Sequence, residues 1–146
     1  MNLAALLSKR VAQGQPIRVG MLGAGKFGTM FLAQAERQKG IHVVGICDLN
    51  PDAARSNLAL VGWHPAQYAA GSLDAAAREG TTHVGDDWEA LVAHPAIDII
   101  IECTGNPMAA VTHILRAFNE GKHVINVTVE ADAFCGPGFG VKAREA

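Results

Sequence analysis

The chain of 146 residues is poor in aromatic residues and in charge, and it has no run of like charges. Aromatic residues make up 5% of the chain and charged residues 18%, and the formal net charge is −2. A nucleic-acid-binding surface needs grouped lysines and arginines, and a surface for single strands needs aromatic rings on which bases stack. The composition therefore argues against nucleic acid as a partner.

Cysteines and long apolar segments are also scarce. Cys47, Cys103 and Cys135 are odd in number and show no CxxC spacing, which argues against a disulfide framework and a zinc site. No segment approaches the roughly 20 apolar residues that span a bilayer, and the apolar run at residues 3–7 is too short for a signal peptide. We therefore expect a soluble, cytoplasmic protein with reduced thiols, no bound metal and no membrane contact.

The chain is rich in hydrophobic residues, 49% of the total, and they are arranged in two alternating patterns. Between short apolar runs, hydrophobic residues recur at spacings of three and four, which is typical of helices with one buried stripe. The alternation predicts an α/β fold, a doubly wound parallel sheet in three α/β/α layers. The predicted strands are residues 17–22, 42–47, 82–84, 97–103 and 123–129.

Capping residues indicate where several helices begin. Asn50 followed by Pro51 predicts a helix start, and Ser72 predicts the start of a short alanine-rich helix. Asp86 with Glu89 three residues later resembles a capping box at the start of another helix.

We expect residues 1–146 to form one domain that begins with a helix within residues 1–15. Near the other end, Gly136, Pro137, Gly138 and Gly140 predict a turn-rich stretch. A helix then starts at residue 141 and stops at residue 146. We therefore expect residues 133–146 to begin a truncated connection to a missing substrate domain.

The strongest chemical signal is a GxGxxG sequence that follows a predicted strand and opens a helix, the context that a dinucleotide fingerprint requires. The first glycine permits a tight turn, the second lets backbone approach a pyrophosphate, and the third allows close packing of the helix on the strands. The helix N-terminus offers free N–H groups to phosphates. The six residues are Gly23-Ala24-Gly25-Lys26-Phe27-Gly28.

An acidic residue stands where this fingerprint expects one. Asp48 ends the second predicted strand, 20 residues after Gly28, in position to accept hydrogen bonds from the adenosine ribose hydroxyls. No arginine adjoins it, which favours NAD over NADP, although Arg55 in the next helix could reach a 2′-phosphate. The alternative interpretation of Asp48 is a local Asx-type contact at the strand end.

The loops after the fourth and fifth predicted strands lie at the same edge of a parallel sheet. Cys103, Thr104 and Gly105 are candidates for cofactor contact, the last two with the nicotinamide ribose or pyrophosphate. Cys103 is expected to be a half-buried thiol rather than a nucleophile. Glu130 and Asp132 follow the fifth strand and could contact cofactor or substrate, or serve as helix caps. No catalytic residue is identified.

Five stretches together carry a family resemblance: residues 17–28, Cys47-Asp48, residues 86–91, residues 98–105 and residues 121–127. They resemble the N-terminal domain of the Gfo/Idh/MocA and homoserine-dehydrogenase-like oxidoreductases. The opening helix and residues 129–137 look closest to the bacterial branch that carries a C-terminal SAF domain, part of which resembles a deoxyxylulose-phosphate reductoisomerase.

The resemblance implies an NAD(P)-dependent oxidoreductase, of which this chain is the cofactor half. A small hydroxy or carbonyl substrate would bind to a following domain, and a homo-oligomer is left open. Gfo/Idh/MocA enzymes usually have Glu-Lys-Pro after the fifth strand, with a catalytic lysine. This chain has Glu130-Ala131-Asp132 there, so that mechanism does not transfer. The alternatives are a nucleotide-sensing module without turnover and an S-adenosylmethionine-dependent methyltransferase.

Overall fold

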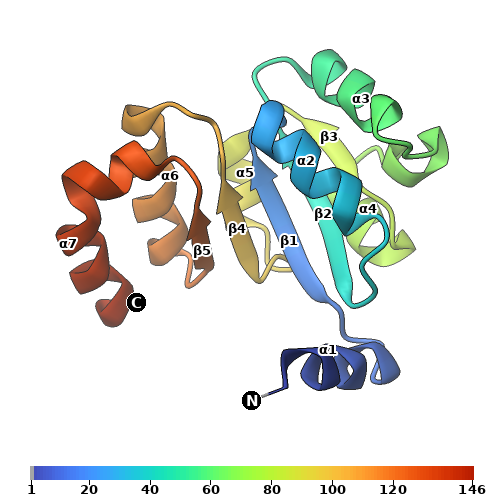
Figure 1. The fold of residues 1–146 in the computed structure, drawn as a ribbon, viewed down its shortest axis with the longest axis horizontal. Helices are drawn as coiled ribbons and strands as arrows, with labels where there is room; N and C mark the ends of the chain where they lie inside the picture. The colour runs from blue at the N-terminus through green and yellow to red at the C-terminus, as the bar shows by residue number, and fades with distance from the viewer. Residues whose placement is uncertain (1) are drawn as a thin grey trace.

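A computed structural model describes residues 2–146 and shows a five-stranded, all-parallel sheet with helices on both faces (Figure 1). The strand order β3-β2-β1-β4-β5 reverses direction between β1 and β4, which is the Rossmann arrangement. The predicted fold class is confirmed. The strands are β1 (Ile17–Leu22), β2 (Ile41–Cys47), β3 (His83–Gly85), β4 (Ile99–Glu102) and β5 (His123–Asn126).

The helices form two layers on the sheet. Buried side chains of α2 and α3 cover one face, and those of α4, α5 and α6 cover the other. None of the helices in residues 2–146 combines the length and apolar character needed to cross a membrane. The helices are α1 (Leu3–Ala12), α2 (Lys26–Ala35), α3 (Pro51–Leu60), α4 (Leu73–Glu79), α5 (Trp88–Ala93), α6 (Pro107–Asn119) and α7 (Val129–Glu145), with a 3-10 turn η1 (Pro65–Tyr68).

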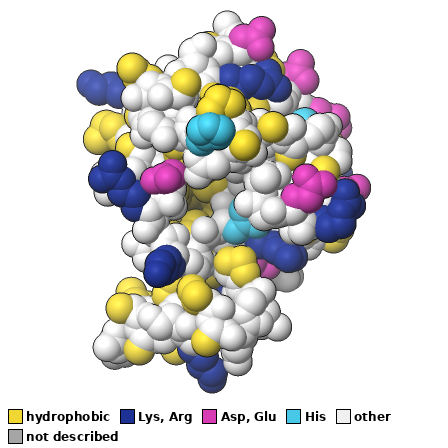
Figure 2. Space-filling model, turned by 90° about the vertical axis from the view of Figure 1, so that its right-hand side faces the viewer, with side chains coloured by type: hydrophobic (Ala, Val, Ile, Leu, Met, Phe, Trp, Pro, Cys, Tyr) yellow, Lys and Arg dark blue, Asp and Glu magenta, His cyan; other side chains and the backbone are white. Residues whose placement is uncertain are grey.

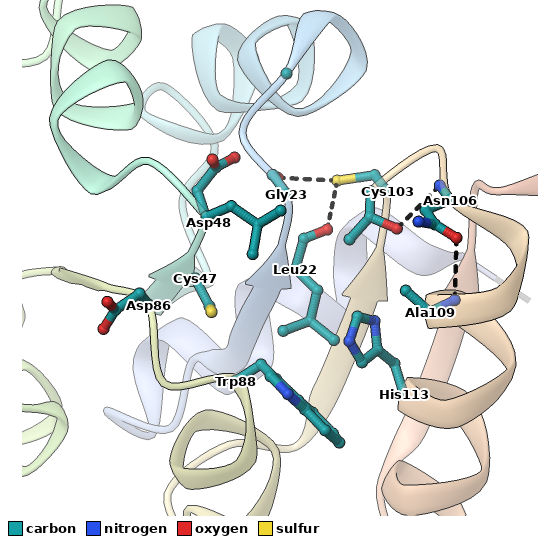
Figure 3. A pocket seen from close by; sticks show the side chains of 13 residues that line it. Leu22, Gly23, Cys47, Asp48, Asp86, Trp88, Cys103, Asn106, Ala109 and His113 are labelled. Atoms are coloured by element: carbon teal, nitrogen blue, oxygen red, sulfur yellow. Dashed lines mark hydrogen bonds between the residues drawn. The ribbon is translucent and has the colours of Figure 1, made fainter.

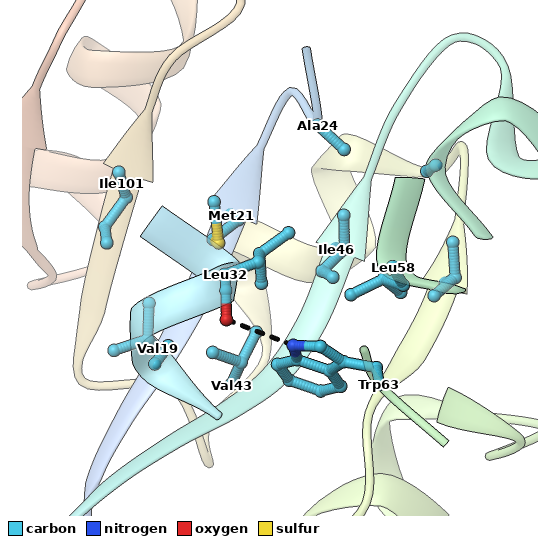
Figure 4. Packing of buried hydrophobic residues seen from close by; sticks show 12 residues of the cluster. Val19, Met21, Ala24, Leu32, Val43, Ile46, Leu58, Trp63 and Ile101 are labelled. Atoms are coloured by element: carbon cyan, nitrogen blue, oxygen red, sulfur yellow. Dashed lines mark hydrogen bonds between the residues drawn. The ribbon is translucent and has the colours of Figure 1, made fainter. Parts of the chain in front are cut away.

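Alternation along β1 builds the two core layers. Val19 and Met21 pack beneath α2 and α3, whereas Leu22 faces α5 and α6, because successive strand residues point to opposite faces. The Trp63 indole N–H donates a hydrogen bond of 3.0 Å to the Leu32 carbonyl (Figure 4), so the polar atom of this buried ring is satisfied. The carboxyl-terminal parts of β1, β2 and β4 are therefore buried on both faces.

The N-terminal helix is confirmed as α1, below the amino ends of the strands (Figure 1). None of its residues is buried, and its Leu7 and Val11 side chains lie close over Gly40, in the turn before β2. Figure 2 shows hydrophobic side chains exposed along this lower part of the molecule, and charges of both signs interspersed above it. The helix lies far from the carboxyl ends of the strands.

Two of the predicted helix caps are confirmed and the third is displaced by one residue. Asn50 Oδ1 accepts from the Ala53 N–H at 3.0 Å, and Ser72 Oγ accepts from the Ala75 N–H at 3.1 Å. At α5 the cap is Asp87, which accepts from the Ala90 N–H at 2.9 Å, so the assignment to Asp86 is wrong. The strand β3 extends to Gly85, and this leaves Asp86 in the loop.

The prediction of a turn-rich stretch before residue 141 is wrong, because residues 136–140 lie inside the 17-residue helix α7. Gly136 and Gly138 do not adopt left-handed backbone conformations here. Ala131 and Phe139 of α7 are buried against α6, so tertiary packing overrides the weak helix propensity of the glycines and Pro137. The strand β5 ends at Asn126, and Glu130 is exposed in the first turn of α7.

Candidate functional site

A cavity of about 410 Å³ opens at the carboxyl ends of β1, β2 and β4, where the strand order reverses (Figure 3). Its volume falls within the range of about 300–1,000 Å³ that small-molecule sites occupy, and ligands of doubly wound sheets bind at this edge. The residues that line it are Leu22, Gly23, Gly25, Cys47, Asp48, Leu49, Asp86, Trp88, Cys103, Thr104, Asn106, Ala109 and His113.

The glycine loop forms one rim of the cavity, and its three glycines have different environments. Gly23 has φ +96°, and a Cβ there would lie 2.8 Å from the Cys103 carbonyl oxygen. A Cβ on Gly28 would lie 2.7 Å from the Gly23 carbonyl oxygen. Gly28 therefore lets α2 pack closely against the glycine loop at the end of β1. At Gly25, the N-cap of α2, a Cβ would meet nothing within 4 Å. Gly25 therefore leaves open space in front of the α2 N-terminus.

Asp48 links the glycine loop to the end of β2. Its Oδ2 accepts a hydrogen bond of 2.8 Å from the Ala24 N–H, and its Oδ1 accepts one of 2.9 Å from the Asn50 N–H. The second bond is the Asx-type contact that the sequence offered as an alternative to ribose binding. The two interpretations are compatible, because an ionised carboxylate has about four acceptor sites.

Arg55 is engaged away from this carboxylate. Its Nη2 donates to the Val84 carbonyl oxygen at 2.7 Å, and its Nη1 pairs with Asp52 at 3.1 Å. The guanidinium would have to give up both contacts to reach a phosphate beside Asp48.

The thiol of Cys103 is a structural donor. Its Sγ donates to the carbonyl oxygens of Gly23 at 3.1 Å and Leu22 at 3.3 Å, which ties β4 to the glycine loop. Burial, with the Glu102 and Asp48 carboxylates adding to it, raises the pKa of Cys103 from an ordinary 9.0 to about 12. Burial and the neighbouring Asp48 likewise raise the pKa of Cys47 to about 12. Neither thiol has the thiolate character of a nucleophile.

The rate of alkylation measures the thiolate character of each cysteine directly. Iodoacetamide at pH 8 should modify Cys135, which is half-buried in α7, well before Cys47 or Cys103. A rise in pKa from 9.0 to about 12 lowers the thiolate fraction about a thousandfold at that pH. Peptide mass spectrometry over time gives the order, and the urea-unfolded chain, in which all three thiols should react, is the control. A Cys103 that reacts as fast as Cys135 in the folded protein would contradict the assignment.

A buried carboxylate behind the cavity holds two of its loops. Glu102 is fully buried, and both of its oxygens accept hydrogen bonds, from the Thr104 hydroxyl at 2.5 Å and from the Thr128 hydroxyl. Thr128 Oγ1 in turn accepts from the Gly105 N–H at 3.1 Å. Burial raises the pKa of Glu102, but the hydrogen bonds from His113, Thr104 and Thr128 outweigh it and leave the pKa lowered. The ionised carboxylate thus joins the loop after β4 to the start of α7.

His113, on α6, lines the cavity and was not among the residues that the sequence suggested. Its Nδ1 lies 3.3 Å from Glu102 Oε1, and its ring packs on Trp88 with centroids 4.6 Å apart. In the sequence, His113 is distinguished only by its position seven residues after Asn106, the N-cap of α6. That spacing does not reveal its partner Glu102 on the neighbouring strand.

The predicted site residues fall into two groups. Gly23, Gly25, Asp48, Cys103 and Thr104 line the cavity. The others do not: Ala24 is buried beneath the loop, Lys26 and Phe27 are exposed at the start of α2, Gly28 packs on Gly23, Gly105 contacts Thr128, and Glu130 is exposed on α7. Residues 2–146 contain no group of three or more histidine, cysteine or acidic side chains placed to hold a metal.

Comparisons with known proteins identify relatives of this chain and agree with its fold. A homoserine dehydrogenase from Methylobacillus glycogenes is 32% identical over 120 residues, which cover 76% of this chain and 24% of that protein. The crystal structure of a homoserine dehydrogenase from Thiobacillus denitrificans superposes with a TM-score of 0.68 at 24% identity, covering 90% of this chain and 28% of that one. A 3-ketoreductase from Actinomadura kijaniata, solved with TDP-benzene and NADP, gives 0.66 at 20% identity, covering 90% and 36%.

The chain thus spans about a quarter of the length of the curated relative that it matches. The two solved structures show the fold alone at these identities. The sequence model described as "Homoserine dehydrogenase, NAD binding domain" matches residues 23–134, from the first glycine of the loop into α7. The suggested closer kinship with the SAF-domain branch stays a prediction. The chain belongs to the NAD-binding domain family of the homoserine dehydrogenases.

Proposed function

We propose that this chain is the cofactor half of an oxidoreductase that transfers a hydride between a nicotinamide dinucleotide and a small hydroxy or carbonyl substrate. The observation that carries the proposal is one cavity bordered by the open face of Gly25, the carboxylate of Asp48 and the loop at Thr104. A pyrophosphate, an adenosine ribose and a nicotinamide ribose need these three kinds of group at this edge of a Rossmann sheet. The cofactor itself supplies the hydride chemistry.

Each part of the chain has a separate task in this proposal. The N–H groups at the α2 N-terminus face the pyrophosphate, which can approach because Gly25 carries no Cβ. Asp48 accepts from the ribose hydroxyls while its bonds to Ala24 and Asn50 fix its orientation. Thr104, held by Glu102, lines the side toward the nicotinamide, and Gly105 behind it is held by Thr128.

The substrate and the catalytic groups are proposed to lie on another domain. Glu130-Ala131-Asp132 offers no lysine at the start of α7, and Glu130 does not line the cavity. We further propose a cytoplasmic protein whose partners are the dinucleotide and a small molecule, and not nucleic acid or a membrane.

A ligand panel tests the proposal. Isothermal titration of the 146-residue protein with NAD, NADP and S-adenosylmethionine should show binding of NAD, weaker binding of NADP and none of S-adenosylmethionine. Binding of S-adenosylmethionine alone would point to a methyltransferase. Absence of binding by either dinucleotide would overturn the proposal.

A further inference from the structure

Beneath the glycine loop, the cavity has largely apolar walls, and we call this part of it the slot. Leu22, Cys47 and Ala109 contribute to these walls, and Trp88 lies at the lower end (Figure 3). His113 lies at the same end, between Ala109 and Trp88, and only 9% of its surface is exposed. A slot of this kind suits a flat heterocycle whose faces are apolar and whose edge is polar.

The imidazole of His113 is fixed on two sides. The Glu102 carboxylate faces Nδ1 at 3.3 Å, and the Trp88 ring packs against the imidazole. Hydrogen bonds to Glu102 keep the pKa of that carboxyl lowered despite its burial, so Glu102 acts as an acceptor only. Nδ1 must therefore carry the proton, and in the neutral imidazole Nε2 carries the lone pair.

Nε2 of His113 is available to a ligand. It makes no hydrogen bond within residues 2–146. In the same part of the chain, Thr81 Oγ1 is the only fully buried side-chain nitrogen or oxygen without a partner. Nε2 is therefore not sealed in the core, and the surface that His113 retains faces the cavity that it lines.

The position of the slot indicates which part of a dinucleotide would enter it. Asp48, the proposed ribose ligand, borders the cavity next to Cys47, whereas no residue of β5 or α7 lines it. Cys47 at the end of β2 and Trp88 after β3 place the slot on the Asp48 side of β1, so the base attached to the ribose at Asp48, the adenine, is the one that would enter it. Adenine presents an exocyclic amino group, a donor that matches a single acceptor nitrogen.

We propose that His113, positioned by Glu102, reads the purine of the dinucleotide by accepting a hydrogen bond from its 6-amino group at Nε2. The inference rests on the proposed cofactor function and extends it to a residue that determines base specificity. A 6-oxo purine places an oxygen acceptor opposite the lone pair, so the same contact disfavours hypoxanthine.

The test compares NAD with nicotinamide hypoxanthine dinucleotide by isothermal titration at pH 8. The parent should bind NAD roughly tenfold more tightly, since one buried hydrogen bond is lost and an acceptor is left unpaired. His113→Phe keeps a ring against Trp88 but has no acceptor, and it should reduce the ratio to about one. His123→Phe makes the same change at an exposed histidine on β5 and should keep the parent's ratio.

The possible failures are distinguishable. A parent that binds neither dinucleotide overturns the cofactor site and this inference with it. A parent that binds both equally, or prefers the hypoxanthine form, overturns the inference alone. If His113→Phe does not fold, the ¹⁵N resonance of His113 Nε2 in the parent replaces it. That resonance should move on titration with NAD, and an unchanged resonance at saturation would reject the contact.

Discussion

Gly25→Val is expected to abolish dinucleotide binding while leaving the fold intact. The backbone at Gly25 has φ −72° and ψ −154°, outside the left-handed region that favours glycine, and a Cβ there meets no protein atom within 4 Å. A branched side chain would instead occupy the space in front of the α2 N-terminus that a pyrophosphate needs. Loss of two charge-assisted hydrogen bonds, each about 1.5–3 kcal/mol, should weaken NAD binding by roughly a hundredfold or more.

Gly71→Val is the matched control for this variant. A Cβ on Gly71 also meets nothing within 4 Å, its φ lies outside the left-handed region, and it does not line the cavity. Both variants should keep the parent's circular dichroism and melting temperature, and Gly71→Val should also keep its affinity for NAD. If calorimetry shows that Gly25→Val binds NAD as well as the parent, the loop does not hold the pyrophosphate.

The sequence predicted the fold well because its local signals and the tertiary contacts agree. The apolar run at β1 and the cap at Asn50 both reappear where expected, since each is determined by residues close in sequence. The failure at α7 has the opposite cause. Gly136 and Pro137 favour a turn locally, but burial of Phe139 against α6 stabilises a helix, and sequence spacing does not show that contact.

The residues of the candidate site also differ in how far the sequence could predict them. Gly23, Gly25 and Asp48 were predictable because a fixed spacing relates them along one βαβ unit. Glu102 and His113 were not, because their significance depends on a contact between β4 and α6 and on the Thr128 hydroxyl 26 residues away. Glu102 is fully buried, and only the structure reveals which loops it joins.

Cofactor preference depends on the charge of Asp48. A 2′-phosphate on the adenosine ribose would lie beside a carboxylate whose Oδ atoms already point at the Ala24 and Asn50 amides. At about 4 Å and an effective dielectric constant near 20, each unit-charge repulsion costs about 4 kcal/mol. Solvent and salt should reduce this to about 1–3 kcal/mol, a tenfold to hundredfold preference for NAD.

Asp48→Ser should therefore weaken NAD binding modestly and remove the penalty on NADP, which shifts the affinity ratio by roughly tenfold or more. The change also removes the acceptors for the Ala24 and Asn50 amides, so part of the loss will reflect a looser glycine loop. Asp48→Asn separates the two effects, because it neutralises the charge but keeps one acceptor oxygen. Titrations of both cofactors against the parent and the two variants measure the ratio.

Arg55 provides the decisive control on cofactor preference. Since its guanidinium is held by the Val84 carbonyl and by Asp52, we expect Arg55→Gln to leave NADP affinity within about twofold of the parent. If the guanidinium instead left those partners to pair with a 2′-phosphate bidentately, the parent would bind NADP more tightly than NAD, and Arg55→Gln would abolish that preference. A parent with that preference would show that the arginine, and not the charge of Asp48, determines which cofactor the domain selects.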